Sequence, residues 1–201
     1  SGQVLQEPYT VRKARVVVRE MAESAALDLL DKRMVTDQLV LTIGYDTASL
    51  SNEDARTTYK GEVKTDYYGR KVPKHAHGTA NLESPTSSAR LISEAVMELF
   101  DRIVNPKLLV RRINLTTNHV VDEETAAKNP SPVQYDLFTD YEALERKQRE
   151  EKERLAKERQ IQTAILNIKK QFGKNAILKG LNYEEGATAK ERNEQIGGHK
   201  A

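Results

Sequence analysis

The chain has 201 residues and a mass of 22.7 kDa, with 38% hydrophobic, 5% aromatic and 31% charged residues and a mean hydropathy of -0.68. This length allows one ordinary domain with an appendage, or two small domains, and the low apolar fraction predicts that part of the chain is solvated helix or tail. The absence of cysteine excludes a disulfide framework, a zinc ribbon, an iron–sulfur site and thiol catalysis, while a net charge of +2 does not by itself indicate a nucleic-acid-binding protein.

The chain lacks the signals of secretion and membrane insertion. No apolar stretch approaches the roughly 20 residues that a membrane helix needs, and no signal-peptide pattern opens the sequence. It begins at Ser1 without an initiator methionine, which predicts a piece of a longer protein or a processed product. We therefore expect a soluble protein from a reducing compartment.

The first half of the chain alternates between strand and helix periodicity. A short strand is predicted near Gln3–Leu5, and apolar residues then recur every three or four positions over Val11–Lys32, as in an amphipathic helix. Over Gln38–Asp46 the period changes to two, which is typical of a half-buried strand. A polar loop and a hairpin follow, with Tyr59–Lys64 going out and a turn at 66–70 bringing the chain back.

The next segment completes a domain over residues 1–119. Alternation over Lys74–Leu82 predicts another strand, and Ser84 with Pro85 provides a capping hydroxyl and a first-turn proline for a second helix. That helix ends at Asn105 and Pro106, and a last strand follows over Leu108–Thr117. The predicted fold class is α+β. The order β-α-β-β-α-β forms a two-layer sandwich in which two helices cover one face of a four-stranded sheet.

The chain changes character after this domain. Residues 122–132 are polar and contain two prolines, so we predict a linker over residues 120–139. A long charged helix is predicted over 140–172, stabilised by Glu-to-base pairs four residues apart that contribute about 0.2–0.5 kcal/mol each without further packing. Gly173 ends this helix, and the tail over 173–201 is expected to be mobile.

The end of the long helix carries an amphipathic face. Such a face must be buried against the same chain or against a partner. We expect the partner to be an accessory protein or the catalytic core of the same enzyme. The face is formed by Ile161, Ile165, Ile168 and Phe172.

Residues suited to catalysis are sparse. The acidic cluster at 122–124 lies in the predicted linker and reads as a solvated turn rather than a metal site. No glycine-rich phosphate loop or nucleophile elbow is present. His75 and His77 share one strand face at a spacing that can bind a metal, but no third ligand is apparent. A metal-dependent small hydrolase is therefore the weaker alternative.

The open face of the predicted sheet is better suited to binding. If Ile113 and Leu115 face the helices, alternation places Arg112 on the open face and Arg111 on the opposite one. Small hydroxyls beside basic residues suit phosphate contacts that hold a duplex without reading its sequence, although an ordinary solvated face has the same pattern. The candidate DNA-binding residues are Thr42, Lys74, His75, His77, Thr79, Arg111, Arg112, Asn114 and Thr116.

Short motifs spread over nearly the whole chain carry a family resemblance. Their order and spacing, rather than any single motif, make them specific. They are Ser1–Leu5, Arg19–Glu23, Leu41–Tyr45, His77–Leu82, Thr86–Ser87, Val110–Ile113, Ile168–Ala176 and Arg192–Ala201. In this order they resemble the little-finger domain of Y-family translesion DNA polymerases, particularly the UmuC-like (ImpB/MucB/SamB) branch, and the last two look like the C-terminal extension of Gram-positive members.

The resemblance implies the C-terminal part of a lesion-bypass polymerase that grips damaged primer–template DNA in DNA repair and the SOS response. It assigns phosphate contacts to Arg111 and Arg112. The catalytic carboxylates and their magnesium ions belong to a palm domain, so this chain is expected to have no catalytic residue, metal or cofactor of its own, and no polymerase activity. The parent protein would be a DNA-directed DNA polymerase in the bacterial cytoplasm, associated with the nucleoid.

A second motif agrees with that implication. Gln134–Phe138 matches the Q-x-x-L-F peptide found in ligands of the bacterial sliding clamp. Leu137 and Phe138 would be apolar anchors for a hydrophobic pocket, and Gln134 offers amide hydrogen bonds, unless these side chains pack on their own domain. The alternative function, from a different class, is a protein-interaction adaptor that docks a partner through its long helix and does not bind DNA.

Overall fold

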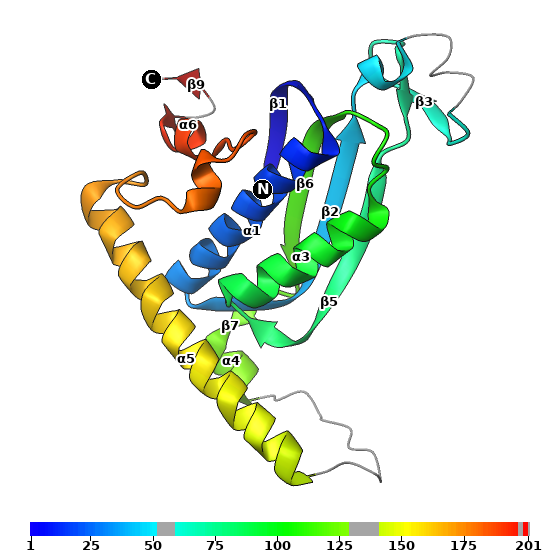
Figure 1. Cartoon of the computed structure of the whole chain (residues 1–201). Coiled ribbons are helices and arrows are strands. Elements are labelled where there is room, and N and C mark those ends of the chain that lie inside the picture. The colour runs from blue at the N-terminus through cyan, green and yellow to red at the C-terminus, as the bar shows by residue number, and fades with distance from the viewer. Residues whose placement is uncertain (52–58, 129–140, 197–198, 201) are drawn as a thin grey trace.

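The computed structural model describes residues 1–51, 59–128, 141–196 and 199–200. A central antiparallel sheet forms one layer of the fold (Figure 1). Its four main strands confirm the predicted number, and a short fifth strand extends it. In spatial order they are β1 (Gly2–Tyr9), β6 (Val110–Asn118), β2 (Met34–Tyr45) and β5 (Ala76–Thr86), with β7 (Val121–Asp122) pairing with the start of β2.

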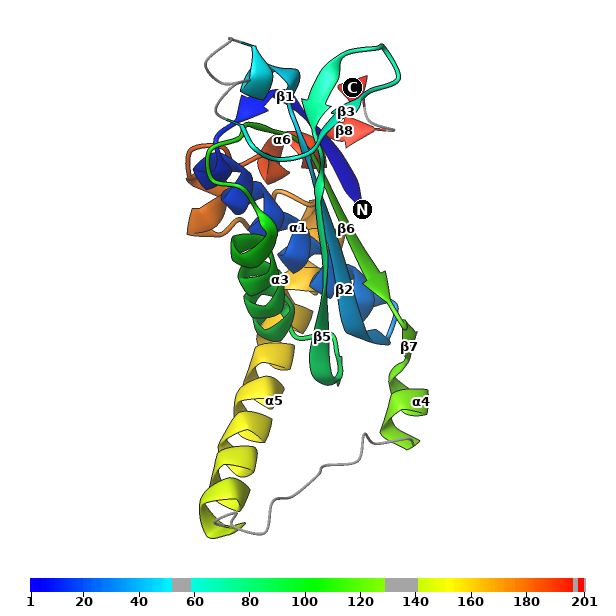
Figure 2. The same cartoon turned by 90° about the vertical axis from the view of Figure 1, so that its right-hand side faces the viewer.

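Two helices form the second layer, α1 (Val11–Asp31) and α3 (Ala89–Ile103), and both lie on the same side of the sheet (Figure 2). The α+β architecture is therefore as predicted. The start of α3 is not. Because the backbone still pairs through Thr86 with β2, the strand continues past the predicted start of the helix, and Ser88 caps α3 by accepting from the Leu91 N–H at 3.1 Å.

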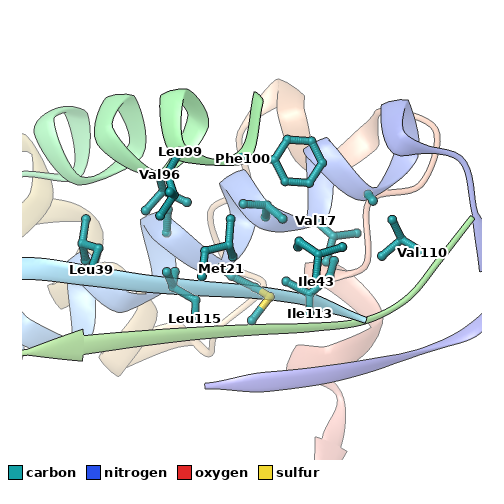
Figure 3. Close-up of a cluster of buried hydrophobic side chains, with 14 of the residues drawn as sticks. Val17, Met21, Leu39, Ile43, Val96, Leu99, Phe100, Val110, Ile113 and Leu115 are labelled. Atoms are coloured by element: carbon teal, nitrogen blue, oxygen red, sulfur yellow. The ribbon is translucent and has the colours of Figure 1, made fainter. Parts of the chain in front are cut away.

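The core lies between the two helices and the sheet (Figure 3). Its large side chains are nearly excluded from water, and burying each contributes about 1.5–3 kcal/mol. Gly78 of β5 allows α3 to approach closely, since a Cβ there would lie 2.8 Å from Leu99 Cδ1. The core includes Val17, Met21, Leu39, Leu41, Ile43, Val96, Leu99, Phe100, Ile113 and Leu115.

The predicted hairpin is present as a separate two-stranded sheet. Its strands are β3 (Val63–Thr65) and β4 (Lys71–Pro73), and the short 3-10 helix η1 (Thr47–Leu50) lies against β4. The turn at 66–70 is where the sequence predicts it. The hairpin projects beyond the end of the main sheet at which β2 stops and β5 starts (Figure 1).

The segment predicted as a linker over 120–139 begins with β7 and the helix α4 (Glu123–Lys128). This structure depends on contacts with residues far away in the sequence. Val121 pairs with Val35 at the start of β2, and the Glu123 carboxylate receives two hydrogen bonds from the Arg159 guanidinium, at 2.6 and 2.8 Å. Glu123 and Glu124 of the acidic cluster thus lie in the first turn of α4, where negative charge is favourable, while Asp122 ends β7.

The predicted long helix is confirmed as α5 (Tyr141–Phe172), which ends at Gly173 with a positive φ of 98°. It does not stand free of the domain. Glu158 accepts hydrogen bonds from the Ser88 hydroxyl and the Arg90 N–H, both at 2.8 Å, and the buried Gln162 bonds the backbone of the same turn. The polar side chains of α5 therefore satisfy the free N–H groups at the start of α3.

The tail, for which mobility was expected, has regular secondary structure in its described residues. It contains η2 (Gly180–Tyr183), α6 (Ala189–Asn193), β8 (Gln195–Ile196) and β9 (His199–Lys200), and it lies beside α1 (Figure 1). Its anchor is Glu20 of α1, only 4% exposed, whose carboxylate accepts hydrogen bonds from the tail. A buried carboxylate needs such partners, so the tail is fastened to the domain.

Candidate nucleic-acid interface

The face of the sheet turned away from α1 and α3 carries most of the candidate DNA-binding residues (Figure 2). Buried and more exposed side chains alternate over Leu39–Tyr45 of β2 and over Arg112–Thr116 of β6. Leu41 and Ile113 are fully buried under the helices, whereas Thr42, Arg112 and Asn114 lie on the other side and are partly or fully exposed. We call this surface the open face.

Cross-strand register arranges the open face in transverse rows. In one row, Thr42 of β2 lies between Asn114 of β6 and His77 of β5, and the Thr42 hydroxyl is 2.9 Å from His77 Nδ1. In the next row, Val40 separates Thr116 from Thr79. The structure thus brings six predicted residues onto one surface: Thr42, His77, Thr79, Arg112, Asn114 and Thr116.

A further row was missed by the sequence analysis. Gln38 lies between Asn118 and Asn81, donating to Asn81 Oδ1 at 3.0 Å and accepting from Asn118 Nδ2 at 3.1 Å. Three amides therefore span three strands and add hydrogen-bonding groups to the open face. Each one continues the two-residue alternation of its strand, which was the available signal, but their alignment depends on the register between strands.

Arg112 places a permanent positive charge on the open face. Within the described part of the chain no ion pair or hydrogen bond holds its guanidinium, and the residue is exposed. It faces Gly44 across the β2–β6 pair, where a Cβ would come within 3.2 Å of the Arg112 Cβ. Gly44 therefore leaves room for the close packing of β2 against the Cβ of Arg112.

Arg111 is placed differently. Its Nη1 donates to the Gln6 carbonyl at 2.9 Å, and its Nε lies 3.6 Å from a carboxylate oxygen of Asp46. The same Asp46 accepts from the Ala48 N–H at the start of η1. Arg111 lies at the register shift between Gly44–Arg112 and Tyr45–Val110, so strand alternation does not place it opposite Arg112. Its guanidinium ties β6 to its neighbours.

Lys74 and His75 precede β5 at the base of the hairpin. Lys74 Nζ pairs with Glu62 at 2.6 Å, and this hydrogen bond holds the pKa of the Glu62 carboxyl below its ordinary value. His75 is exposed beside it. Over residues 1–51, 59–128, 141–196 and 199–200, no group of three or more His, Cys, Asp or Glu side chains is placed to hold a metal, so the pair His75 and His77 has no described third ligand.

The residues predicted to contact protein partners are the clamp-binding peptide and the apolar face of α5. Gln134, Leu137 and Phe138 lie outside the described residues. On α5, Ile161 is 61% and Phe172 68% exposed, while Ile165 and Ile168 are half-buried where α5 runs beside α1.

Two further observations describe the molecular surface. Hollows of about 430 and 340 Å³ occur beside η1 and between α1 and β6, and none of the candidate DNA-binding residues lines either one. The candidate site is thus a surface rather than a pocket. None of the described helices has the length and apolarity required to cross a bilayer.

Comparison with known proteins gives one match. The model of the family described as impB/mucB/samB family C-terminal domain matches residues 1–131. A search of curated proteins finds no match. The matched segment comprises the whole open face, the hairpin and α4, and it leaves out α5 and the tail.

Proposed function

We propose that this chain, which belongs to the impB/mucB/samB C-terminal domain family and is the C-terminal part of a Y-family polymerase, grips DNA through its open face. The observation that carries the proposal is the exposed guanidinium of Arg112, for which no internal partner is described, on a polar face turned away from the helices. Arginine pairs well with phosphate because its planar fork offers several N–H donors.

The neighbouring groups support contacts to the DNA backbone. Asn114, Thr116 and Thr79 offer amide and hydroxyl groups that hydrogen-bond phosphate oxygens and sugars. Such contacts position a protein on a duplex without reading its bases. Binding of this kind tolerates a damaged template, which suits a role in translesion synthesis, DNA repair and the SOS response at the bacterial nucleoid.

This chain would bind DNA and carry out no chemical step. Polymerisation and its magnesium ions would belong to the palm domain of the parent enzyme. Primer–template DNA is the first partner. The second is the sliding clamp, proposed on the peptide Gln134–Phe138, whose two apolar anchors and amide match the chemistry of a hydrophobic clamp pocket.

The experiment compares two adjacent arginines in duplex binding by fluorescence anisotropy at several salt concentrations. Arg112→Ala should weaken binding about tenfold and lower the salt slope by about one phosphate contact. Arg111→Ala removes the same charge from a side chain held by Gln6 and Asp46, and it should change affinity much less. An unchanged affinity and salt slope in Arg112→Ala would contradict the open-face interface, and an equal loss in both variants would add Arg111 to it.

A second candidate function is a protein-interaction adaptor, which the exposed Ile161 and Phe172 on α5 favour. An accessory protein or the catalytic core of the polymerase would then cover this helix. Absence of duplex binding at low salt, together with a partner whose binding is lost in Ile161→Ser with Phe172→Ser, would support the adaptor over the DNA-binding function.

A further inference from the structure

The tip of the β3–β4 hairpin presents two aromatic rings to solvent. Tyr67 is 96% and Tyr68 77% exposed, the largest exposed fractions among the large apolar side chains that the structure describes. Their rings meet edge to face, with centroids 5.4 Å apart and an interplanar angle of 87°. Because neither ring is packed into the core, the fold does not explain why two aromatic residues stand there.

The turn that carries these rings is held firmly. Asp66 accepts hydrogen bonds through one carboxylate oxygen from the Tyr68 N–H at 3.0 Å and the Arg70 N–H at 2.9 Å. Its other oxygen pairs with the Arg70 guanidinium at 2.7 Å, and Gly69 adopts the positive φ of 78° that the turn requires. The Arg70 guanidinium also lies 5.2 Å from the centroid of the Tyr68 ring. The tip is therefore pre-organised for binding.

The surroundings of the tip are basic. From Lys60 to Lys74 the chain has five basic and two acidic residues. Among the residues that the structure describes, Lys60, Lys64 and Lys71 form no ion pair. The hydrogen bond from Lys74 lowers the pKa of the Glu62 carboxyl, and the charge of the nearby Lys64 lowers it further. A polyanion matches this charge better than an apolar pocket on another protein does.

The hairpin also lies next to the open face. It leans toward the side of the sheet opposite α3 (Figure 2). Arg112 pairs with Gly44, one residue before the end of β2, so it occupies the hairpin end of the open face. A nucleic-acid strand that leaves a duplex at this end would pass the exposed tyrosines.

We propose that Tyr67 and Tyr68 stack on unpaired bases of a single strand that continues from the duplex held on the open face, while the hairpin lysines contact its phosphates. Stacking of this kind tolerates any base sequence because every base has a π-face. The inference rests on the proposed DNA-binding function and specifies the form of the DNA, which is a duplex with a single-stranded extension.

The test compares a blunt duplex with the same duplex carrying a single-stranded overhang, by fluorescence anisotropy with the 201-residue chain. The wild type should bind the overhang DNA more tightly. Tyr67→Ala with Tyr68→Ala should lower affinity for the overhang DNA about tenfold and leave affinity for the blunt duplex within twofold. Replacing both residues by Phe should retain the preference, because the stacking surface remains. Tyr183→Ala, at a tyrosine 70% exposed on the tail, is the matched control and should change neither affinity.

The outcomes separate the two proposals. If the wild type fails to bind the blunt duplex, the open-face function is contradicted. The hairpin inference is then tested by comparing the affinities of the wild type and the double alanine variant for the overhang DNA. An overhang affinity that the double alanine substitution does not change overturns the inference. An equal loss on both DNAs, or a loss of the overhang preference in the Phe variant, also overturns it.

Discussion

The backbone N–H of Thr188 donates a hydrogen bond of 2.8 Å to the carboxylate of Glu20, which lies 168 residues earlier in the chain. The same Glu20 oxygen accepts from the Ala189 N–H at 3.0 Å, and the other accepts from the Asn182 amide at 2.8 Å. One buried side chain on α1 thus satisfies the free N–H groups at the start of α6 and holds η2. The attachment of the tail depends on this carboxylate.

Glu20→Gln is expected to release the tail. The amide keeps the shape of the side chain but turns an N–H₂ group toward backbone donors, leaving buried polar groups unpaired at a cost of about 1–3 kcal/mol. Hydrogen exchange at Thr188 and Ala189 should become faster, and the free energy of unfolding in urea should fall. Glu98→Gln, on the exposed side of α3, is the control and should change neither. Unchanged exchange in the Glu20 variant would contradict the assigned anchor.

Glu158→Ala is expected to destabilise α3 at its start. It removes the acceptor for the Ser88 hydroxyl and the Arg90 N–H, and loss of a helix cap costs about 0.5–2 kcal/mol. Urea unfolding followed by circular dichroism measures the change. Glu153→Ala, exposed on the same helix, should stay within about 0.5 kcal/mol of the wild type. Equal losses at both positions would show that the charge of α5, not the contact with α3, matters.

The hairpin turn should weaken in acid. The hydrogen bond from the Arg70 side chain holds the pKa of Asp66 below its ordinary value of 3.8. A carboxyl whose pKa is lower in the folded state stabilises that state above its unfolded pKa, and the stabilisation is lost as the pH falls through the lowered value. NMR titration should show the Tyr68 and Arg70 amide signals shifting together with the Asp66 carboxyl. Asp66→Asn should remove that pH dependence, and a dependence that survives in this variant would assign it to another group.

Leu137→Ala with Phe138→Ala is expected to lower the affinity for purified sliding clamp at least tenfold in surface plasmon resonance, because both apolar anchors are lost. Tyr135→Ala, at a position that the Q-x-x-L-F pattern leaves open, is the matched control and should retain binding. Duplex affinity without the clamp should be the same in all three proteins. Clamp binding that persists without both anchors would reject this peptide as the tether.

Much of the candidate interface was predictable because strand alternation is a local property. A period of two assigns Thr42, Arg112 and Asn114 to one face before any partner strand is known. The engagement of Arg111 by Asp46 was not predictable, and neither was the amide row centred on Gln38, since each depends on which strands become neighbours and in what register.

The amino-acid sequence alone determined the two layers, the hairpin turn, the open face and the length of α5, because apolar period, caps and turn residues act over a few positions. Only the tertiary structure decided what the polar segments do. In sequence, Gln162 and Glu20 look like solvated residues of charged helices, yet both are buried and hydrogen-bonded to distant backbone. A polar group is buried only where distant residues supply its hydrogen-bond partners, and the residue type alone does not predict those partners.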